Sequence, residues 1–170
     1  MAGLLSFPNP VNETSARVVA GGVVTMAAGA VALDQPWLMV PLTYGFAARV
    51  ATGPKLSPLG QLATKVVTPR LKVQHRFSPG PPKRLAQAMG LAMSGGALAL
   101  HYGFRRPSAA KRLLAVLITA AGLEAVFGLC LACKLFALGM RVGVVPESVC
   151  EECRDISRRL AGEAPPVQAA

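Results

Sequence analysis

Two identical cysteine pairs are the residues of this chain whose types and spacing point most directly to chemistry. Cys130 and Cys133 flank the dipeptide Leu-Ala, and Cys150 and Cys153 flank Glu-Glu, all shortly after a long apolar segment. Thiols at this spacing bind a metal ion together or cycle between dithiol and disulfide. The pairs therefore predict sulfur chemistry, and their spacing alone leaves open which kind.

The separation between the pairs suits a single metal site. Sixteen residues lie between Cys133 and Cys150, and the resulting pattern is typical of four-thiolate zinc sites. The same ligands also suit an iron–sulfur cluster. Tetrahedral ligation requires the chain to turn between the pairs, and Gly143 and Pro146 favour such a turn. All four cysteines are therefore candidate ligands of zinc or of an iron–sulfur cluster.

The other interpretation makes the same four cysteines the catalytic residues of a thiol redox protein. Cysteines three residues apart on a helix lie within disulfide range. We expect Cys130 and Cys133 late in a helix, where the helix dipole opposes ionisation and only Lys134 favours the thiolate. Simple packing explains the apolar first pair but not Cys150 and Cys153, which lie among charged residues. We favour thiol redox as the function, with a non-catalytic metal-binding scaffold as the alternative.

Composition places this chemistry at a membrane. Hydrophobic residues make up 52% of the 170 residues and charged residues only 15%, with a mean hydropathy of +0.45, whereas soluble domains carry about 25% charged residues. The net charge is +10 and aromatic residues make up 5%. Because the basic residues are not interleaved with aromatics, nucleic acid is excluded as a partner and the lipid bilayer is expected instead.

The apolar runs predict an all-α fold, an integral membrane four-helix transmembrane bundle. The expected spans are residues 15–33, 37–50, 85–104 and 110–130, and the last can continue as one helix through Met140. Leucines and valines at helical spacing over residues 56–68 indicate either a surface amphipathic helix or a solvated loop. We expect one membrane domain over residues 1–160, including a short C-terminal helix that carries Cys150 and Cys153, and a disordered tail over 161–170.

The distribution of basic residues predicts the orientation. Lys and Arg concentrate in the middle loop and the C-terminal segment, which favours a multi-pass protein of the inner membrane with both termini in the cytoplasm. The basic residues over 105–112 fall on the opposite side and depart from this rule. In this topology both cysteine pairs face a reducing compartment, which disfavours permanent disulfides.

One carboxylate, Glu124, lies inside the fourth apolar run. A carboxylate at membrane depth requires a partner, and Arg49 and Arg17 belong to the same half of the predicted bundle. We therefore predict a structural ion pair of Glu124 with one of these arginines. A proton relay beside the thiols is the alternative, but Glu124 and Cys133 are expected on opposite faces of one straight helix.

Several short motifs resemble an uncharacterised family of bacterial integral membrane proteins, DUF4395. They include Phe7–Thr14, Gly45-Phe46 with Arg49, Gly53-Pro54, Ser57-Pro58, Gly80–Arg84, Glu124-Ala125, Phe127-Gly128, Cys130, Cys133-Lys134, Pro146-Glu147, Cys150 and Cys153. Ala132 departs from the glycine expected between the first two cysteines. The resemblance implies a membrane location and no established activity. It also implies a thioredoxin-like or sulfurtransferase protein as partner, because such proteins are encoded near members of the family.

Overall fold

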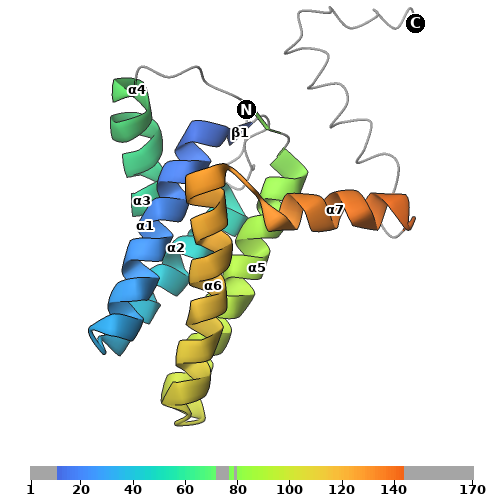
Figure 1. Cartoon of the computed structure of the whole chain (residues 1–170). Coiled ribbons are helices and arrows are strands. Elements are labelled where there is room, and N and C mark those ends of the chain that lie inside the picture. The colour runs from blue at the N-terminus through green and yellow to red at the C-terminus, as the bar shows by residue number, and fades with distance from the viewer. Residues whose placement is uncertain (1–10, 72–76, 79, 144–170) are drawn as a thin grey trace, which may run out of the picture.

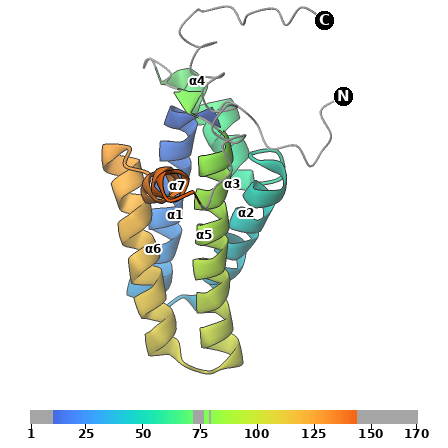
Figure 2. The same ribbon diagram turned by 90° about the vertical axis from the view of Figure 1, so that its right-hand side faces the viewer.

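The computed structural model describes residues 11–71, 77–78 and 80–143 of the chain. These residues form an all-helical fold. Its long helices lie side by side, and the helix Leu131–Arg141 projects sideways from near one end of the bundle (Figures 1 and 2). In chain order the elements are β1 (Val11–Asn12), α1 (Glu13–Ala32), the 3-10 turn η1 (Pro36–Leu38), α2 (Met39–Thr52), α3 (Pro58–Gln61), the π-helical η2 (Leu62–Val67), α4 (Thr68–Arg70), β2 (Phe77–Ser78), α5 (Gly80–Leu98), the π-helical η3 (Ala99–Gly103), α6 (Pro107–Phe127) and α7 (Leu131–Arg141).

The long helices begin and end where the sequence provides caps and breaks. Asn12 starts α1, because its side chain accepts hydrogen bonds from the N–H groups of Thr14 at 2.9 Å and Ser15 at 3.4 Å. Asp34 has a φ of 52° just after α1 ends. Pro41 falls in the first turn of α2, a position that tolerates proline, so α2 continues through it. Helix over each of the four predicted apolar stretches is therefore confirmed.

The core between the helices is built from small and medium apolar side chains. Ala27 and Ala97 are fully buried, and such small residues let helix backbones approach closely. The closest approach joins α2 to α5, where a Cβ added to Gly90 would lie 2.1 Å from the ring of Phe46. The larger members of the core cluster are Val23, Met39, Leu42, Phe46, Leu114 and Leu117.

The segment predicted as either an amphipathic helix or a loop is helical. The elements α3, η2 and α4 follow one another without a break over residues 58–70. They pack along α1, where the hydroxyl oxygens of Ser15 and Thr68 are 2.8 Å apart. Leu59 closes over Gly22, whose added Cβ would lie 2.6 Å from the leucine side chain. This helix is therefore part of the bundle.

By length and composition alone, one described helix, α1, is suited to crossing a membrane. The bent pair of α6 and α7 makes a second candidate if the two helices form one span. Helix α2 has only 14 residues and is too short to be a candidate span by this measure. The all-α fold is thus confirmed, and the arrangement as four membrane spans stays a prediction.

The predicted continuation of the fourth helix through Met140 is wrong. The chain bends by 95° between α6 and α7, because Gly128 takes the left-handed conformation with φ 68°. The N–H of Gly128 donates to the carbonyl of Glu124 at 3.0 Å, and the N–H of Leu129 donates to that of Leu123 at 3.2 Å. This paired pattern is the glycine-dependent stop signal of a helix. The predicted helix with Cys150 and Cys153, and the tail over 161–170, lie outside the described residues.

Candidate functional site

The bend after α6 places the first cysteine pair at the start of a helix. Cys130 is the N-cap residue of α7, and its sulfur accepts a hydrogen bond from the N–H of Cys133 at 3.3 Å. The prediction that these cysteines lie late in a helix is therefore wrong, since the new helix begins at Leu131. At a helix N-terminus the dipole and the free N–H groups favour a thiolate.

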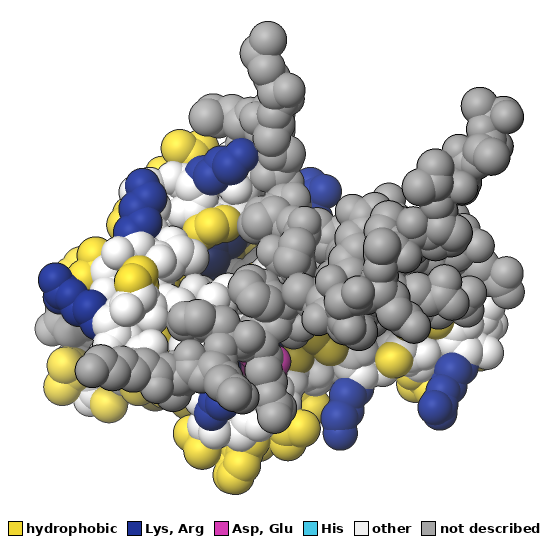
Figure 3. Space-filling model, turned by 90° about the horizontal axis from the view of Figure 1, so that it is seen from above, with side chains coloured by type: hydrophobic (Ala, Val, Ile, Leu, Met, Phe, Trp, Pro, Cys, Tyr) yellow, Lys and Arg dark blue, Asp and Glu magenta, His cyan; other side chains and the backbone are white. Residues whose placement is uncertain are grey.

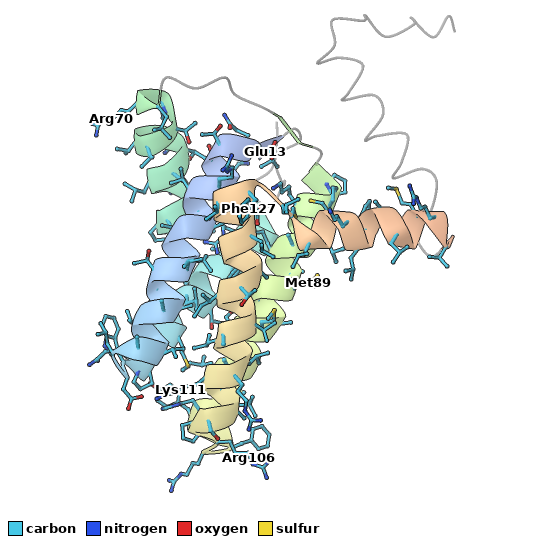
Figure 4. The ribbon with its side chains drawn as sticks, viewed as in Figure 1. Glu13, Arg70, Met89, Arg106, Lys111 and Phe127 are labelled. Atoms are coloured by element: carbon cyan, nitrogen blue, oxygen red, sulfur yellow. The ribbon has the colours of Figure 1, made fainter. Side chains whose placement is uncertain are left out.

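Arg17 fixes the bend from the neighbouring helix. Its guanidinium donates to two carbonyls in the last turn of α6, those of Ala125 at 3.1 Å and Val126 at 2.6 Å. A Cβ added to Gly128 would lie 3.3 Å from the carboxylate of Glu13. Glu13 on α1 and Phe127 on α6 lie at the same end of the bundle, whereas Arg106 and Lys111 lie at the other (Figure 4). The bend before Cys130 is thus held by the first turns of α1.

The partner of Glu124 is Lys83. The Lys83 ammonium donates to Glu124 Oε1 at 2.6 Å, and the two side chains are only 5% and 15% exposed. The predicted ion pair with Arg49 or Arg17 is thereby corrected. Lys83 lies in the first turn of α5, which brings it to the level of Glu124 near the end of α6.

Arg49 instead binds neutral partners. Its Nε donates to Gln87 Oε1 at 2.7 Å, and its Nη1 donates to Ser57 Oγ at 3.1 Å. The guanidinium also lies 4.6 Å from the centre of the Phe46 ring, within cation–π distance. Arg49 therefore joins α2 to α5 and to the turn before α3.

The two thiols have opposite pKa shifts. A hydrogen bond from the thiol of Cys133 lowers the pKa of Cys130 to about 7. The charge of Lys83 and the backbone N–H of Cys133 act in the same direction, whereas burial and the charge of Glu124 raise it. The same contact raises the pKa of Cys133 well above its usual range, and burial adds to this. As pH rises through about 7 the thiolate of the pair therefore forms at Cys130, while Cys133 stays a thiol.

Lys83 stays charged beside this thiolate. Burial lowers the pKa of Lys83, but Glu124 and the two cysteine sulfurs act in the opposite direction and raise it overall. The site thus consists of one buried cation shared between a carboxylate and a thiolate. The expectation that Glu124 points away from the cysteines fails, because it assumed a straight helix across the bend at Gly128.

A cavity of about 270 Å³ opens directly beside Cys130. Its walls are mainly apolar, with Phe46 from α2 and Met93 from α5 among them, and Glu124 and Gln87 are its polar groups. Met89, which also lines it, lies on α5 below α7 (Figure 4). The thiolate therefore borders a largely apolar space.

The four-cysteine metal site is left as a prediction. Two of its four ligands, Cys150 and Cys153, lie outside the described residues. In the described ranges no cluster of three or more His, Cys, Asp and Glu side chains is placed to hold a metal ion. Sequence reasoning missed Lys83, which follows two prolines in an apparent loop and gives no sign of burial.

Comparisons with known proteins give one result. No curated protein and no solved structure was found to be similar to this chain. A family model does match residues 11–141, which include all the described helices and the Cys130–Cys133 pair. The chain therefore belongs to the family described as a domain of unknown function, DUF4395.

Proposed function

We propose that this chain is a membrane thiol redox protein whose Cys130–Cys133 pair cycles between disulfide and dithiol. The observation that carries the proposal is the position of Cys130 at the N-cap of α7, with the N–H of Cys133 on its sulfur. The nearby charge of Lys83 favours the thiolate further. Stabilising the thiolate stabilises the reduced pair, which makes the disulfide a better oxidant.

The different exposure of the two sulfurs suggests the order of events. Cys130 is buried and Cys133 is partly exposed, so a thiolate of a reduced partner attacks the Cys133 sulfur of the disulfide. A mixed disulfide forms and Cys130 leaves as the thiolate, the better leaving group because of its lower pKa. A second partner thiol then attacks the partner's own sulfur, which releases Cys133 and closes the partner disulfide. Two electrons and two protons pass to the cysteine pair.

The partner follows from the same chemistry. A dithiol that presents two thiols in succession is needed, which is the chemistry of Cys150 and Cys153 or of a separate thioredoxin-like protein. In either case the exchange takes place at the end of the bundle that carries Cys130.

The outer surface of the bundle supports a membrane location. Large apolar side chains stand outward on several helices, among them Val40 and Tyr44 on α2 and Val116 and Val126 on α6, each more than half exposed. Helix α6 has 21 residues and spans roughly 30 Å at 1.5 Å per residue, the thickness of a hydrocarbon core. We infer a four-span inner-membrane bundle with both termini on the cytoplasmic side.

Helix α7 fits the boundary between lipid and water. It projects sideways from near one end of the bundle (Figures 1 and 2), after a bend of 95° from α6. One stripe along it is apolar and exposed, made of Leu131, Leu135, Leu138 and Val142. Lys134 and Arg141 lie beside this stripe, as in helices that rest on a membrane surface. Seen from this end, Lys and Arg side chains lie at several places along the part of the edge that is in view, with apolar side chains between them (Figure 3). The cysteine pair is then at headgroup level.

Thiol trapping across redox buffers tests the proposal. The full chain in lipid nanodiscs is equilibrated at graded glutathione ratios, quenched in acid, alkylated and analysed by mass spectrometry. We expect a reversible Cys130–Cys133 disulfide in the wild type, with the remaining cysteine of that pair left unpaired by its neighbour in Cys133→Ser and in Cys130→Ser. Cysteines that never form this disulfide, or that resist alkylation because each chain holds one tightly bound metal ion, would contradict the proposal.

A further inference from the structure

The cavity beside Cys130 reaches the outer apolar surface of the bundle. Four of its lining residues are also exposed, each by more than a third of its surface, and they come from three helices: Met89 on α5, Val116 on α6, and Leu131 and Leu135 on α7. All four side chains are apolar. This outlet therefore suits a molecule that is dissolved in lipid, not one that is dissolved in water.

The interior of the cavity suits a flat, uncharged ring. Its volume of about 270 Å³ is well above the roughly 150 Å³ at which an apolar cavity admits benzene. Phe46, Met89 and Met93 are among its walls, and aromatic rings and thioethers both make favourable contacts with a ring. Glu124 also lines the cavity, but the ammonium of Lys83 already neutralises it at 2.6 Å. The charges at the cavity are therefore balanced without a charged ligand.

Gln87 adds a polar group to this lining. Its Oε1 accepts a hydrogen bond from Arg49 Nε at 2.7 Å. The amide oxygen is therefore occupied, and the side chain has its N–H groups to offer as donors. A ring that carries carbonyl oxygens matches such a lining better than a plain hydrocarbon does.

The proposed thiol cycle requires an electron acceptor at this place. It leaves Cys130 and Cys133 as a dithiol, which must lose two electrons before the next cycle. Cys130 lines the cavity, whereas Cys133 is partly exposed and lies outside the cavity lining. An acceptor in the cavity would therefore meet Cys130 and leave Cys133 accessible to the dithiol partner.

We propose that this cavity binds the ring of a lipid-soluble quinone, which accepts the electrons of the Cys130–Cys133 dithiol. This inference rests on the proposed thiol redox function and names its electron acceptor. A quinone is flat, uncharged and rich in carbonyl oxygen, and its apolar tail would leave through the outlet beside Val116. The described lining offers no Lys or Arg to the phosphates of a flavin or nicotinamide cofactor.

The electron transfer balances as two successive displacements. The Cys130 thiolate adds to a ring carbon of the quinone, a C–S bond forms, and one ring oxygen takes a proton from water. The Cys133 thiol then attacks the Cys130 sulfur and gives up its proton. The S–S bond forms, the electron pair of the C–S bond returns to the ring, and the second ring oxygen takes up a proton. The dithiol is oxidised to the disulfide, and the quinone is reduced to the hydroquinone.

Anaerobic reaction of the pre-reduced full chain with decylubiquinone in lipid nanodiscs tests the inference. The absorbance of the quinone measures its reduction, and alkylation followed by mass spectrometry measures the disulfide. We expect hydroquinone to appear together with the Cys130–Cys133 disulfide. Oxidised glutathione, applied to a parallel sample, is a water-soluble oxidant that does not need the cavity.

Two cavity variants and two matched controls make the result decisive. Ala120→Phe fills the cavity from α6, whereas Ala115→Phe adds the same side chain at an exposed position of that helix outside the lining. Quinone reduction should be about tenfold slower in Ala120→Phe, a loss of roughly 1.4 kcal/mol, and unchanged in Ala115→Phe. If Ala120→Phe does not fold, Val116→Trp at the outlet decides, with Val40→Trp on α2 as its control, because both valines are more than half exposed.

The two oxidants separate this inference from the proposed function. Slower quinone reduction in the cavity variants alone, with equal oxidation of all variants by glutathione, would support it. A disulfide that forms with glutathione but not with the quinone would overturn the quinone site and leave the thiol function standing. Equal quinone reduction by the wild type, Ala120→Phe and Val116→Trp would also overturn it. A Cys130–Cys133 disulfide that forms with neither oxidant would overturn both.

Discussion

Removing Lys83 should destabilise the fold far more than removing a lysine from an exposed ion pair. Lys83→Met leaves the carboxylate of Glu124, only 15% exposed, without its partner at 2.6 Å. Breaking a buried pair by removal of one partner costs about 3 to 5 kcal/mol. Because Glu124 keeps some access to solvent, we expect the lower end, about 3 kcal/mol, in the free energy of unfolding.

The molecule contains its own control. Lys111 and Asp34 form an ion pair at 2.8 Å, but with side chains that are 37% and 75% exposed. Solvent screens such a pair, so Lys111→Met should leave the melting temperature nearly unchanged. For a chain of this length a loss of about 3 kcal/mol corresponds to a fall of roughly 10 °C.

Circular dichroism during heating in detergent measures both losses. The double variant Lys83→Met with Glu124→Gln should melt above Lys83→Met alone, because the penalty arises from the uncompensated carboxylate. The assignment of a buried, coupled pair would be refuted if the stability losses of Lys83→Met and Glu124→Gln simply added in the double variant. An equal loss of stability in Lys111→Met and Lys83→Met would refute it too.

Three further predictions concern the cysteine end and the helix contacts. Alkylation of Cys130 should rise with pH and reach half its maximal rate near pH 7, since its pKa is lowered and the thiolate forms as pH passes that value; a midpoint above pH 8.5, that of a free cysteine, would contradict the site. Gly128→Ala, at φ 68° and near the carboxylate of Glu13, should lower the melting temperature more than Gly143→Ala, at φ 76° with open space around it. An equal fall in both variants would show that only backbone strain, and not the contact with Glu13, sets the loss. Gly90→Ala should cost about 1 to 3 kcal/mol by overpacking, whereas Gly21→Ala, with nothing within 4 Å, should be neutral in thermal melts; two neutral variants would argue against the close approach of α2 and α5.

The helices could be predicted because apolar runs report them directly. The stretch expected over residues 15–33 is α1 over Glu13–Ala32, and the stretch over 110–130 is α6 over Pro107–Phe127. Asp34 follows the end of α1 and Pro107 begins α6, and both of these helix-breaking residues can be read from the sequence. Periodicity and breaking residues were therefore enough to place these helices to within a few residues.

The site could be identified by residue type but not by geometry. Gly128 lies in a mainly apolar segment, and a glycine within such a segment does not reveal whether it packs against a neighbouring helix or ends its own. That one backbone conformation moves Cys130 from the end of one helix to the start of another, which reverses the effect of the dipole on its thiolate. The partner of Glu124 could not be predicted for a related reason. Lys83 lies in an apparent loop of the sequence, and its burial depends on how α5 packs against α6.

The hydrogen bonds from Arg17 to the carbonyls of Ala125 and Val126 join residues that are 108 and 109 positions apart in the sequence. The ribosome synthesises Arg17 well before residues 125 and 126, so these hydrogen bonds form only when α6 has docked against α1. The bend that places Cys130 at the start of α7 therefore depends on the packing of the first long helix against the last.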